Sequence, residues 1–376
     1  MSIYGGAETV VKEIALGLKN LGIENLITSL NVSESLVSGD LNIKVPERFF
    51  PYKLRSISFL SCVGVINEII HLRHLVKKHA KYFDLINVHN FPANWVIAGL
   101  KKPIVWMCNE PPDLWNNPAP SPLLKVLRYF GIKLDRFFVN RYIDKICVAD
   151  ILNAQRVYQR YRRQAEIVPY GIEYEFFSSE PSDLDRIYKK YDIDRGDFII
   201  TQVGDLSPQK NQLVTIKAIG TLKDKIPNIK LILVGKDTGV YRNLLQDYIE
   251  KKELKGFIIF TGQMSKADVR DIYYTSKIAV FPVREQGGWL SPFEALSCKI
   301  PIIVYPSMGA ASVIEKHKLG IVNYDLEDMI LEIHKNYSHY KEISQKAGEW
   351  IRENLSWKKF IDKMVDIFKE VLRCEY

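Results

Sequence analysis

The sequence predicts an α/β fold built from two Rossmann-type domains, and three observations support this prediction. The chain has 376 residues, which is more than one ordinary hydrophobic core accommodates. Short apolar runs that read as buried strands alternate with helical patterns through both halves of the chain. Each run is followed by a turn and then by a helical pattern, which is typical of parallel strands covered by helices on both faces.

The candidate strands divide into a group in the first half of the chain and a group in the second. They cover residues 84–88, 103–106 and 145–148, and then residues 198–203, 229–234, 257–260, 277–281 and 301–304. We expect the linker between the two domains to lie between Val168 and Asp194. Residues 356–368 repeat apolar side chains at helical spacing and predict a helix near the carboxyl terminus.

The amino terminus departs from this alternating pattern. A glycine loop such as Gly5 and Gly6 normally follows a hydrophobic strand at the centre of the sheet, and only Met1 to Tyr4 precede it. We therefore expect the first domain to lack its usual first strand, and the reading frame to continue upstream.

Composition places the chain among ordinary globular proteins, with 47% apolar and 26% charged residues. The five cysteines include no Cys-x-x-Cys pair, which argues against a disulfide framework or a zinc site and favours a reducing, cytoplasmic location. We see no signal peptide in the sequence and no apolar run of the roughly 18 residues that a membrane-spanning helix needs.

The charge is unevenly distributed along the chain. Residues 1–170 contain 22 Lys and Arg against 14 Asp and Glu, whereas residues 171–376 contain 30 of each. This asymmetry favours an anionic partner, and because we find no nucleic-acid recognition module we expect no nucleic acid. Basic and large apolar side chains alternate in residues 49–59 and 123–143, as in segments that bind an anionic membrane surface. The alternative is a helix that packs on its own domain and exposes a solvated basic face.

The most informative motif lies where Glu285 and Glu294 bracket Gly287 and Gly288. The glycines allow the backbone to approach a ligand closely. A helix predicted to begin near Ser291 would offer free N–H groups to an anion, and the carboxylates can accept hydrogen bonds from sugar hydroxyls. A nucleotide sugar has all of these parts. The alternative is that Glu294 only completes a capping box with Ser291.

This motif resembles the donor-site signature of the retaining GT-B glycosyltransferases of family 4, the group 1 glycosyl transferases. Three further segments match in the same order. Gly5 to Glu8 resembles the first glycine loop of the family, residues 168–173 resemble its turn at the interdomain linker, and residues 203–211 resemble its Val-Gly-Arg-Leu-x-x-x-Lys-Asn loop. The resemblance covers nearly the whole chain and is more specific in the second half.

The resemblance implies a GT-B fold, in which two Rossmann-like domains face a cleft. It makes residues 1–170 the acceptor domain, with a helix at 356–376 packing back on it, and residues 171–355 the donor domain. It implies retaining transfer of a hexose from a UDP- or GDP-hexose to a glycan or lipid-linked acceptor in polysaccharide or glycoconjugate synthesis. It implies no cofactor and no obligatory metal. We expect such a protein to be cytoplasmic and peripheral on the inner face of the membrane.

The resemblance also assigns roles to individual residues. The catalytic candidates are Lys210, Arg284 and Glu285, which would stabilise the leaving nucleoside diphosphate and orient the hexose. The donor-binding candidates are Gly204, Asp205, Gln286, Gly287, Gly288, Trp289, Leu290 and Glu294, of which Glu294 would hold the ribose. The acceptor-side candidates are Gly5, Gly6, Asn109 and Glu110, together with His89, which follows a strand at the edge of a sheet where ligands bind.

The spacing of the two glutamates departs from the family pattern. Eight residues separate Glu285 from Glu294, where the family has seven, so Gln286 stands at the family's first-glutamate distance. We expect a one-residue bulge between Glu285 and Trp289 that returns the Glu285 carboxylate to the cleft. Without that bulge, Gln286 would face the sugar instead.

Two other positions also differ from the family. Asp205 stands where the family usually has an arginine on the diphosphate, which is unfavourable unless Asp205 turns away or Arg284 or Arg242 supplies the missing cation. The acceptor-side loop at residues 108–115 lacks the histidine that the family often carries there.

Two other classes of function remain open. A catalytically weak relative that binds a nucleotide sugar as a regulatory subunit would account for Asp205 and for the altered glutamate spacing. A sugar-nucleotide epimerase of the same architecture would convert the sugar without releasing the nucleotide.

Overall fold

The computed structural model describes residues 6–30, 41–46, 58–109, 111, 122–237, 239–284 and 288–373. The chain forms two compact units. The first comprises Met1–Pro169 together with Lys358–Tyr376, and the second comprises Tyr170–Trp357. Each unit has its own parallel sheet and its own hydrophobic core.

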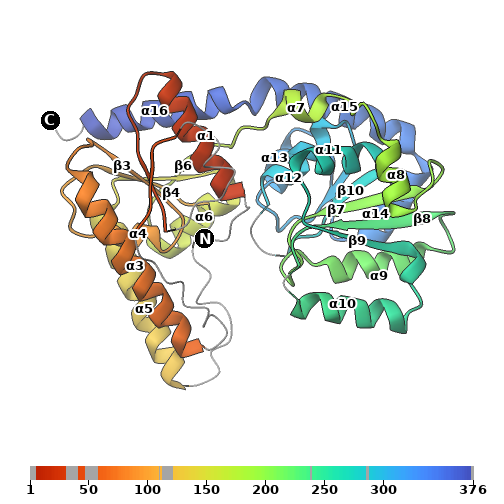
Figure 1. Cartoon of the computed structure of the whole chain (residues 1–376), viewed down its shortest axis with the longest axis horizontal. Helices are drawn as coiled ribbons and strands as arrows, with labels where there is room; N and C mark the ends of the chain where they lie inside the picture. The colour runs from red at the N-terminus through yellow and green to blue at the C-terminus, as the bar shows by residue number, and fades with distance from the viewer. Residues whose placement is uncertain are drawn as a thin grey trace. The chain divides into compact units, whose positions relative to one another are not determined.

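The sheet of the first unit has the strand order β3-β4-β5-β6, with all neighbours parallel. Its central strand β4 is buried along its whole length, which agrees with the unbroken apolar run seen in the sequence. The elements of this unit are α1 (Gly6–Asn20), β1 (Ile27–Thr28), β2 (Ile43–Lys44), α3 (Ser58–Ala80), β3 (Ile86–His89), α4 (Ala93–Val96), β4 (Ile104–Met107), α5 (Pro122–Tyr142), β5 (Lys145–Val148), α6 (Ile151–Tyr161), β6 (Glu166–Ile167) and most of α16 (Trp357–Arg373) (Figure 1).

The carboxyl-terminal helix α16 packs on the first unit. Gly17 of α1 has no room for a Cβ atom, because the side chain of Ile361 occupies that space. Lys363 and Glu370 of α16 form ion pairs with Glu166 at 3.0 Å and with Lys145 at 2.9 Å. These contacts place residues far apart in the sequence on one compact unit.

The strands β1 and β2 pair only with each other, in parallel, apart from the four-stranded sheet. Residues 1–5 lie outside the described residues. The absence of a first strand before α1 therefore stays a prediction.

A buried carboxylate connects three helices of the first unit. Asp135 of α5 is completely buried and accepts hydrogen bonds from Trp95 Nε1 at 2.8 Å, from Tyr161 Oη at 2.8 Å and from Arg160 Nε at 2.9 Å. Trp95 belongs to α4, while Arg160 and Tyr161 belong to α6. Because a buried charge is tolerated only when it is paired and hydrogen-bonded, these contacts fix the base of α5.

The second unit has a six-stranded parallel sheet in the order β12-β11-β10-β7-β8-β9. In Figure 1, α9 and α10 lie on one side of this sheet and α11 and α12 on the other. The elements are α7 (Tyr174–Ser178), α8 (Asp185–Tyr191), β7 (Phe198–Val203), α9 (Gln212–Leu222), β8 (Ile229–Val234), α10 (Val240–Lys251), η1 (Lys255–Phe257), β9 (Ile258–Gly262), α11 (Lys266–Thr275), β10 (Ile278–Phe281), α12 (Leu290–Ser297), β11 (Ile302–Val304), α13 (Ala311–Lys316), β12 (Ile321–Val322), α14 (Leu326–Lys335) and α15 (Tyr337–Asn354).

The two faces of this sheet build separate cores from alternating residues of the same strands. In β8, Leu231 and Leu233 pack into the core that also contains residues of α9, α10 and α14. Ile232 and Val234 face the other way, into the core with Ile187 of α8 and Ile272 of α11. A strand covered on both faces has no polar side, which explains why β8 is apolar apart from Lys230.

The predicted fold class is confirmed, and each of the predicted strands overlaps a strand of the structure. Among the described residues, no helix combines the length and the apolar character that crossing a membrane requires.

Candidate functional site

The strand order of the second unit identifies where a ligand binds. From β9 to β12 the sheet reads as the order 3-2-1-4-5-6, in which the chain direction across the sheet reverses between the first and fourth strands, here β7 and β10. Ligands of such sheets bind at this switch point, outside the carboxyl ends of the strands. The loops that follow β7 and β10 contain most of the donor-site residues predicted from the sequence.

The loops after β7 and β8 approach each other through two glycines. The Gly204 N–H donates to the Val234 carbonyl at 2.8 Å, and a Cβ atom on Gly235 would collide with the Gly204 carbonyl. Only glycine fits at such a close approach of two backbones. Gly235 therefore has a structural reason to be glycine, and Gly204 has one of its own in its φ of 152°, in addition to the donor contact predicted for it.

Asp205 is turned toward the loop after β8. Its Oδ1 accepts the Lys236 N–H at 3.2 Å, and its side chain is exposed. Its carboxylate therefore caps a neighbouring loop, which is one of the two arrangements that the sequence allowed for an acid at this position.

Lys210 is positioned by polar residues from β7 and α9. Gln202 Nε2 donates to the Lys210 carbonyl at 2.6 Å, and Thr215 Oγ1 donates to Gln202 Oε1 at 2.7 Å. A Cβ atom on Gly288 would lie 3.2 Å from Lys210 Nζ. Gly288 has φ of 87°, a conformation that favours glycine. The ammonium group of Lys210 and the backbone that leads into α12 therefore converge.

The β7 and β10 loops are joined by hydrogen bonds to backbone carbonyls. The Arg284 N–H donates to the Gln209 carbonyl at 3.1 Å, and Asn211 Nδ2 donates to the Pro282 carbonyl at 3.1 Å. The Arg284 side chain is exposed beside this junction. Lys210 and Arg284 thus lie on two loops that hold each other in place at the switch point.

Helix α12 begins at Leu290, two residues before the start that a Ser291 N-cap predicts. Its N-cap is Trp289, whose side chain makes no capping hydrogen bond, and Ser291 lies inside the helix. The capping-box interpretation of Ser291 and Glu294 is therefore wrong. The Trp289 ring is buried between Tyr170 and Phe293, with ring centroids 6.2 and 5.0 Å away, and this packing fixes the start of the helix. Leu290 supplies the first helical residue, where N–H groups lack intrahelical partners.

Glu294 is a partly buried carboxylate that makes no hydrogen bond or ion pair with the described part of the chain. Burial raises the pKa of Glu294 to about 7, Lys266 opposes that rise, and Glu173 adds to it. A ligand that donates hydrogen bonds to such a carboxylate stabilises its ionised form. Two vicinal hydroxyl groups, as in a ribose, are such donors.

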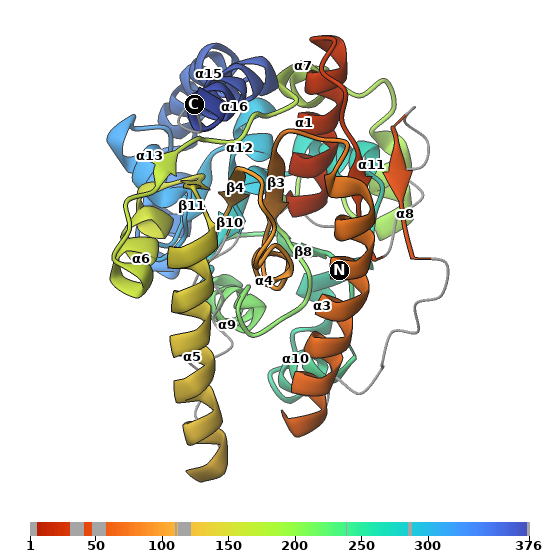
Figure 2. The same ribbon diagram turned by 90° about the vertical axis from the view of Figure 1, so that its left-hand side faces the viewer.

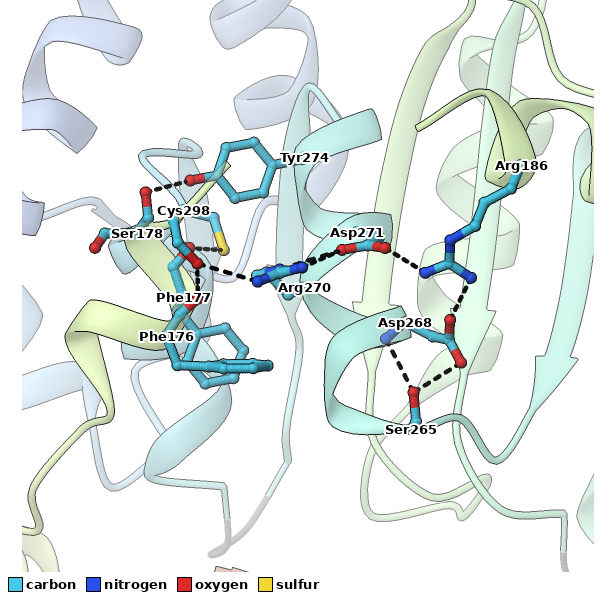
Figure 3. A network of polar contacts seen from close by, with 11 residues as sticks. Phe176, Phe177, Ser178, Arg186, Ser265, Asp268, Arg270, Asp271, Tyr274 and Cys298 are labelled. Atoms are coloured by element: carbon cyan, nitrogen blue, oxygen red, sulfur yellow. Dashed lines mark hydrogen bonds and ion pairs between the residues drawn. The ribbon is translucent and has the colours of Figure 1, made fainter. Parts of the chain in front are cut away.

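The segment that opens the second unit is attached to the helices beside Glu294 (Figure 3). Arg186 of α8 forms ion pairs with Asp268, at 2.6 Å, and with Asp271, both on α11. Tyr274 Oη donates to the Ser178 carbonyl at 2.8 Å, and Cys298 Sγ contacts the Phe177 carbonyl at 3.2 Å. These contacts fix α7 and α8 on α11 and α12.

The ion pair between Glu173 and Lys266 lies in this attached region. Lys266 also lies over the ring of Phe176, 5.0 Å from its centroid. Because α7 and α11 are fixed together, the two charges that act on Glu294 keep their positions. No sequence pattern indicated this pair, whose members are 93 positions apart.

Several predicted site residues lie outside the described residues, and no structural statement is made about them. They are Gly5, Glu110, Glu285, Gln286 and Gly287. The predicted bulge between Glu285 and Trp289 stays a prediction for the same reason.

Three acceptor-side candidates are described in the first unit. Gly6 begins α1. His89 ends β3 opposite Met107 of β4, and Asn109 follows two residues after Met107, so His89 and Asn109 lie at the same edge of the sheet. Burial lowers the pKa of His89 to about 4, so its imidazole is neutral at pH 7, with Nε2 2.8 Å from Asn87 Oδ1. Among the described residues, no group of three or more His, Cys, Asp or Glu could hold a metal ion.

The sequence analysis missed the residues that position Lys210. Gln202 and Thr215 are both buried. A signal was present, because Gln202 is a polar residue inside the apolar run 198–203, and a buried amide must find hydrogen-bond partners.

Comparison with known proteins now identifies the family. A model described as "Glycosyl transferases group 1" matches residues 183–350, and a model described as "Glycosyltransferase Family 4" matches residues 4–176. The chain belongs to the group 1 GT-B glycosyltransferases. Each half of the chain is therefore covered by a glycosyltransferase model of its own.

Individual relatives are distant. The chain is 25% identical to the trehalose synthase of Thermococcus litoralis, over 76% of this chain and 69% of that protein. It is 22% identical to the alpha-monoglucosyldiacylglycerol synthase of Streptococcus pneumoniae, over 63% of this chain and 55% of that protein. Its matches span 55 to 65% of the length of several curated relatives.

Solved structures agree on the fold. The structure of Anabaena Alr3699/HepE in complex with UDP-glucose has a TM-score of 0.77, with 17% identity, over 98% of this chain and 97% of that one. At this identity the similarity establishes the GT-B fold of this group 1 glycosyltransferase.

Proposed function

We propose that this protein transfers a hexose from a nucleotide-diphosphate sugar to a glycan or lipid-linked acceptor, with retention of the anomeric configuration. One observation carries the proposal. At the switch point of the second sheet, Lys210 Nζ meets the backbone at Gly288, and this backbone leads into the helix that carries the unbonded carboxylate of Glu294. A cation, the N–H groups of a helix start and a carboxylate without a bonding partner among the described residues match a diphosphate and a ribose.

In this proposal, the protein stabilises the charge that develops on the departing nucleoside diphosphate. Lys210 and Arg284 supply positive charge, and the N–H groups at Gly288, Trp289 and Leu290 supply hydrogen-bond donors. Glu294 accepts hydrogen bonds from the ribose hydroxyls. Because Asp205 caps the loop after β8, it does not compete with these groups for the diphosphate.

The hexose is oriented by Glu285 or Gln286. No protein nucleophile is required, because an oxygen of the leaving phosphate can accept the proton of the acceptor hydroxyl. The acceptor contacts residues of the first unit at the carboxyl edge of its sheet, where His89 and Asn109 lie. The neutral imidazole of His89 donates its Nε2–H to Asn87 Oδ1, which leaves Nδ1 to accept a hydrogen bond from a sugar hydroxyl.

The donor is UDP- or GDP-hexose. Solved structures of the same fold hold UDP and UDP-glucose, which supports a uridine nucleotide as the first donor to test. We place the protein in the cytoplasm, on the inner face of the membrane. No cofactor and no obligatory metal enters the proposed reaction.

The deciding experiment measures release of nucleoside diphosphate from a panel of UDP-, GDP- and ADP-sugars, with and without extracts that contain lipid-linked or soluble glycans. We expect acceptor-dependent release, and a product whose anomeric configuration by NMR is that of the donor. Binding without turnover would identify a regulatory relative, and a converted sugar that stays on the nucleotide would identify an epimerase. Either result overturns the proposal.

A further inference from the structure

Helix α5 has an exposed face that is both apolar and basic. Val126, Phe130 and Phe137 are 52, 63 and 55% exposed, and they lie within about 40° of one another around the helix axis, given 3.6 residues per turn. Large apolar residues rarely form the outermost stripe of a helix in a protein that stays in water. Two further exposed apolar side chains, Tyr129 and Leu134, lie within about 60° of this stripe, given 3.6 residues per turn.

The charges beside this stripe have one sign. The described basic residues of α5 are Lys125, Arg128, Lys133, Arg136 and Arg141. Its one acidic residue, Asp135, is completely buried and is paired with Arg160. The exposed face of α5 therefore carries positive charge with no acidic side chain to compensate it.

A shallow cavity of about 440 Å³ lies on this face. Its lining includes Lys133, Arg136, Phe137, Asn140 and Arg141. Three cations and an amide around one aromatic ring can hold an anionic group while the ring contacts hydrocarbon. The cavity thus has the chemistry of a phospholipid headgroup site.

Hydrogen bonds to Asp135 hold α5 in place, while the apolar side chains of its outer face are exposed. Figure 2 shows α3 and α5 projecting from the sheet of the first unit on either side of α4, and α4 packs against both helices. The Asp135 hydrogen bonds fix α5 to α4 and α6. On α3, Ile66 and Ile70 are also exposed, at 56 and 59%, one helical turn apart.

We propose that the exposed face of α5 docks the protein on an anionic phospholipid membrane, with a headgroup phosphate between Lys133, Arg136 and Arg141. Charge complementarity favours an anionic membrane, because every charged side chain on this face is basic. The exposed aromatic stripe argues against a purely polar polyanion, because its apolar side chains are stabilised only by contact with hydrocarbon. The inference rests on α5 and is independent of the proposed glycosyl transfer.

The test measures binding to vesicles of phosphatidylglycerol with phosphatidylcholine, and to vesicles of phosphatidylcholine alone. We expect binding to the anionic vesicles at low salt, loss of that binding at high salt, and weak binding to the neutral vesicles. The combined change of Lys133, Arg136 and Arg141 to Gln should lower the vesicle partition coefficient roughly 100-fold at low salt. The change of Phe130 and Phe137 to Ser should lower it at least about tenfold.

A matched control removes three exposed lysines of the second unit, Lys225, Lys251 and Lys252, as Gln. This variant should bind vesicles as the unchanged protein does. All variants should retain their thermal stability and their UDP affinity, because the changed side chains are exposed, or partly exposed at Arg136, and lie outside the predicted donor site. Loss of UDP binding in every protein would sink the proposed function and leave the membrane result interpretable.

Three results would overturn the proposal: no binding to anionic vesicles at low salt, equal weakening by the control variant, or full binding by the Phe130 and Phe137 variant. The last result, together with tight binding to dextran sulfate, would identify a general polyanion surface instead of a membrane site.

Discussion

Glu294, the predicted ribose-binding carboxylate, lowers the unfolding free energy of the free protein near neutral pH. Its pKa near 7 lies above the ordinary value of 4.5, so the folded chain binds a proton that the unfolded chain has released between these pH values. Unfolding free energy therefore falls as pH rises from about 4.5 to 7, which is the reverse of a salt-bridged carboxylate. Removing the charge should stabilise the free protein at pH 8.

The first prediction follows from this sign. Ribose hydroxyls favour the ionised carboxylate, so UDP affinity should rise about tenfold from pH 6 to pH 8, as Glu294 deprotonates around pH 7. Glu294→Gln should abolish that pH dependence, weaken UDP binding by about 1–3 kcal/mol and raise the melting temperature at pH 8. Calorimetric titrations and thermal melts at both pH values check it. Unchanged affinity per folded molecule in Glu294→Gln would remove Glu294 from the site.

Lys210 carries the second prediction. Lys210→Ala removes the cation that approaches Gly288, so turnover of the donor should fall by about 10²–10³ and UDP binding by about 2 kcal/mol. Lys225→Ala, a change at an exposed lysine of the same unit, is the control and should leave both quantities unchanged. Steady-state kinetics, with the donor that the panel of nucleotide sugars identifies, checks this prediction. Equal losses in the two variants would mean that net charge, and not the position of Lys210, matters.

At the scale of helices and strands, the buried Asp135 is the clearest target. Asp135→Asn leaves Arg160 without its counterion in a buried site and weakens the hydrogen bonds from Trp95 and Tyr161. The cost should be about 3–5 kcal/mol of unfolding free energy. Urea denaturation followed by tryptophan fluorescence checks it, with the exposed Asp247→Asn as the control. A loss below about 1 kcal/mol would show that α4, α5 and α6 are held by apolar packing alone.

Sequence patterns predicted the long strands well, because a strand buried on both faces is mostly apolar, as β7 and β8 are apart from Thr201, Gln202 and Lys230. Strands β6 and β12 have two residues each, too few to form a pattern, and were missed. The start of α12 was misplaced because Ser291 is locally a good N-cap, whereas the contacts of Trp289 with Tyr170 and Phe293 decide the outcome. The contact with Tyr170 joins residues more than a hundred positions apart, which no local pattern reveals.

The candidate donor site shows the same division between what local patterns predict and what long-range contacts decide. The sequence predicted Lys210, Arg284 and Glu294, because each belongs to a short motif at a strand or helix end. It did not reveal the orientation of Asp205, which depends on a hydrogen bond to the loop of a different strand. Nor did it reveal the pair of Glu173 and Lys266, which the packing of α7 on α11 brings together.

At the scale of the whole molecule, the two units have separate hydrophobic cores. The core around Val88, Trp106 and Ile146 belongs to the first unit, and the cores on both faces of β7 and β8 belong to the second. The predicted donor groups Lys210, Arg284 and Glu294 all lie in the second unit. A ligand stabilises the folded unit that binds it. Nucleotide should therefore make local opening of the second unit less favourable than before and leave opening of the first unit unchanged.

The last prediction uses this separation. UDP at about 100 times its Kd should stabilise the second unit by about 2.7 kcal/mol. Amide hydrogen exchange should therefore slow in β7, β8 and the first turn of α12, while β4 and β5 of the first unit exchange at an unchanged rate. Mass spectrometry of peptides from the two sheets, with and without UDP, gives the measurement, and Glu294→Gln at the same UDP concentration is the control. Equal slowing in both sheets would mean that the two cores open together. Slowing confined to the first unit would mean that the nucleotide binds there and not in the second unit.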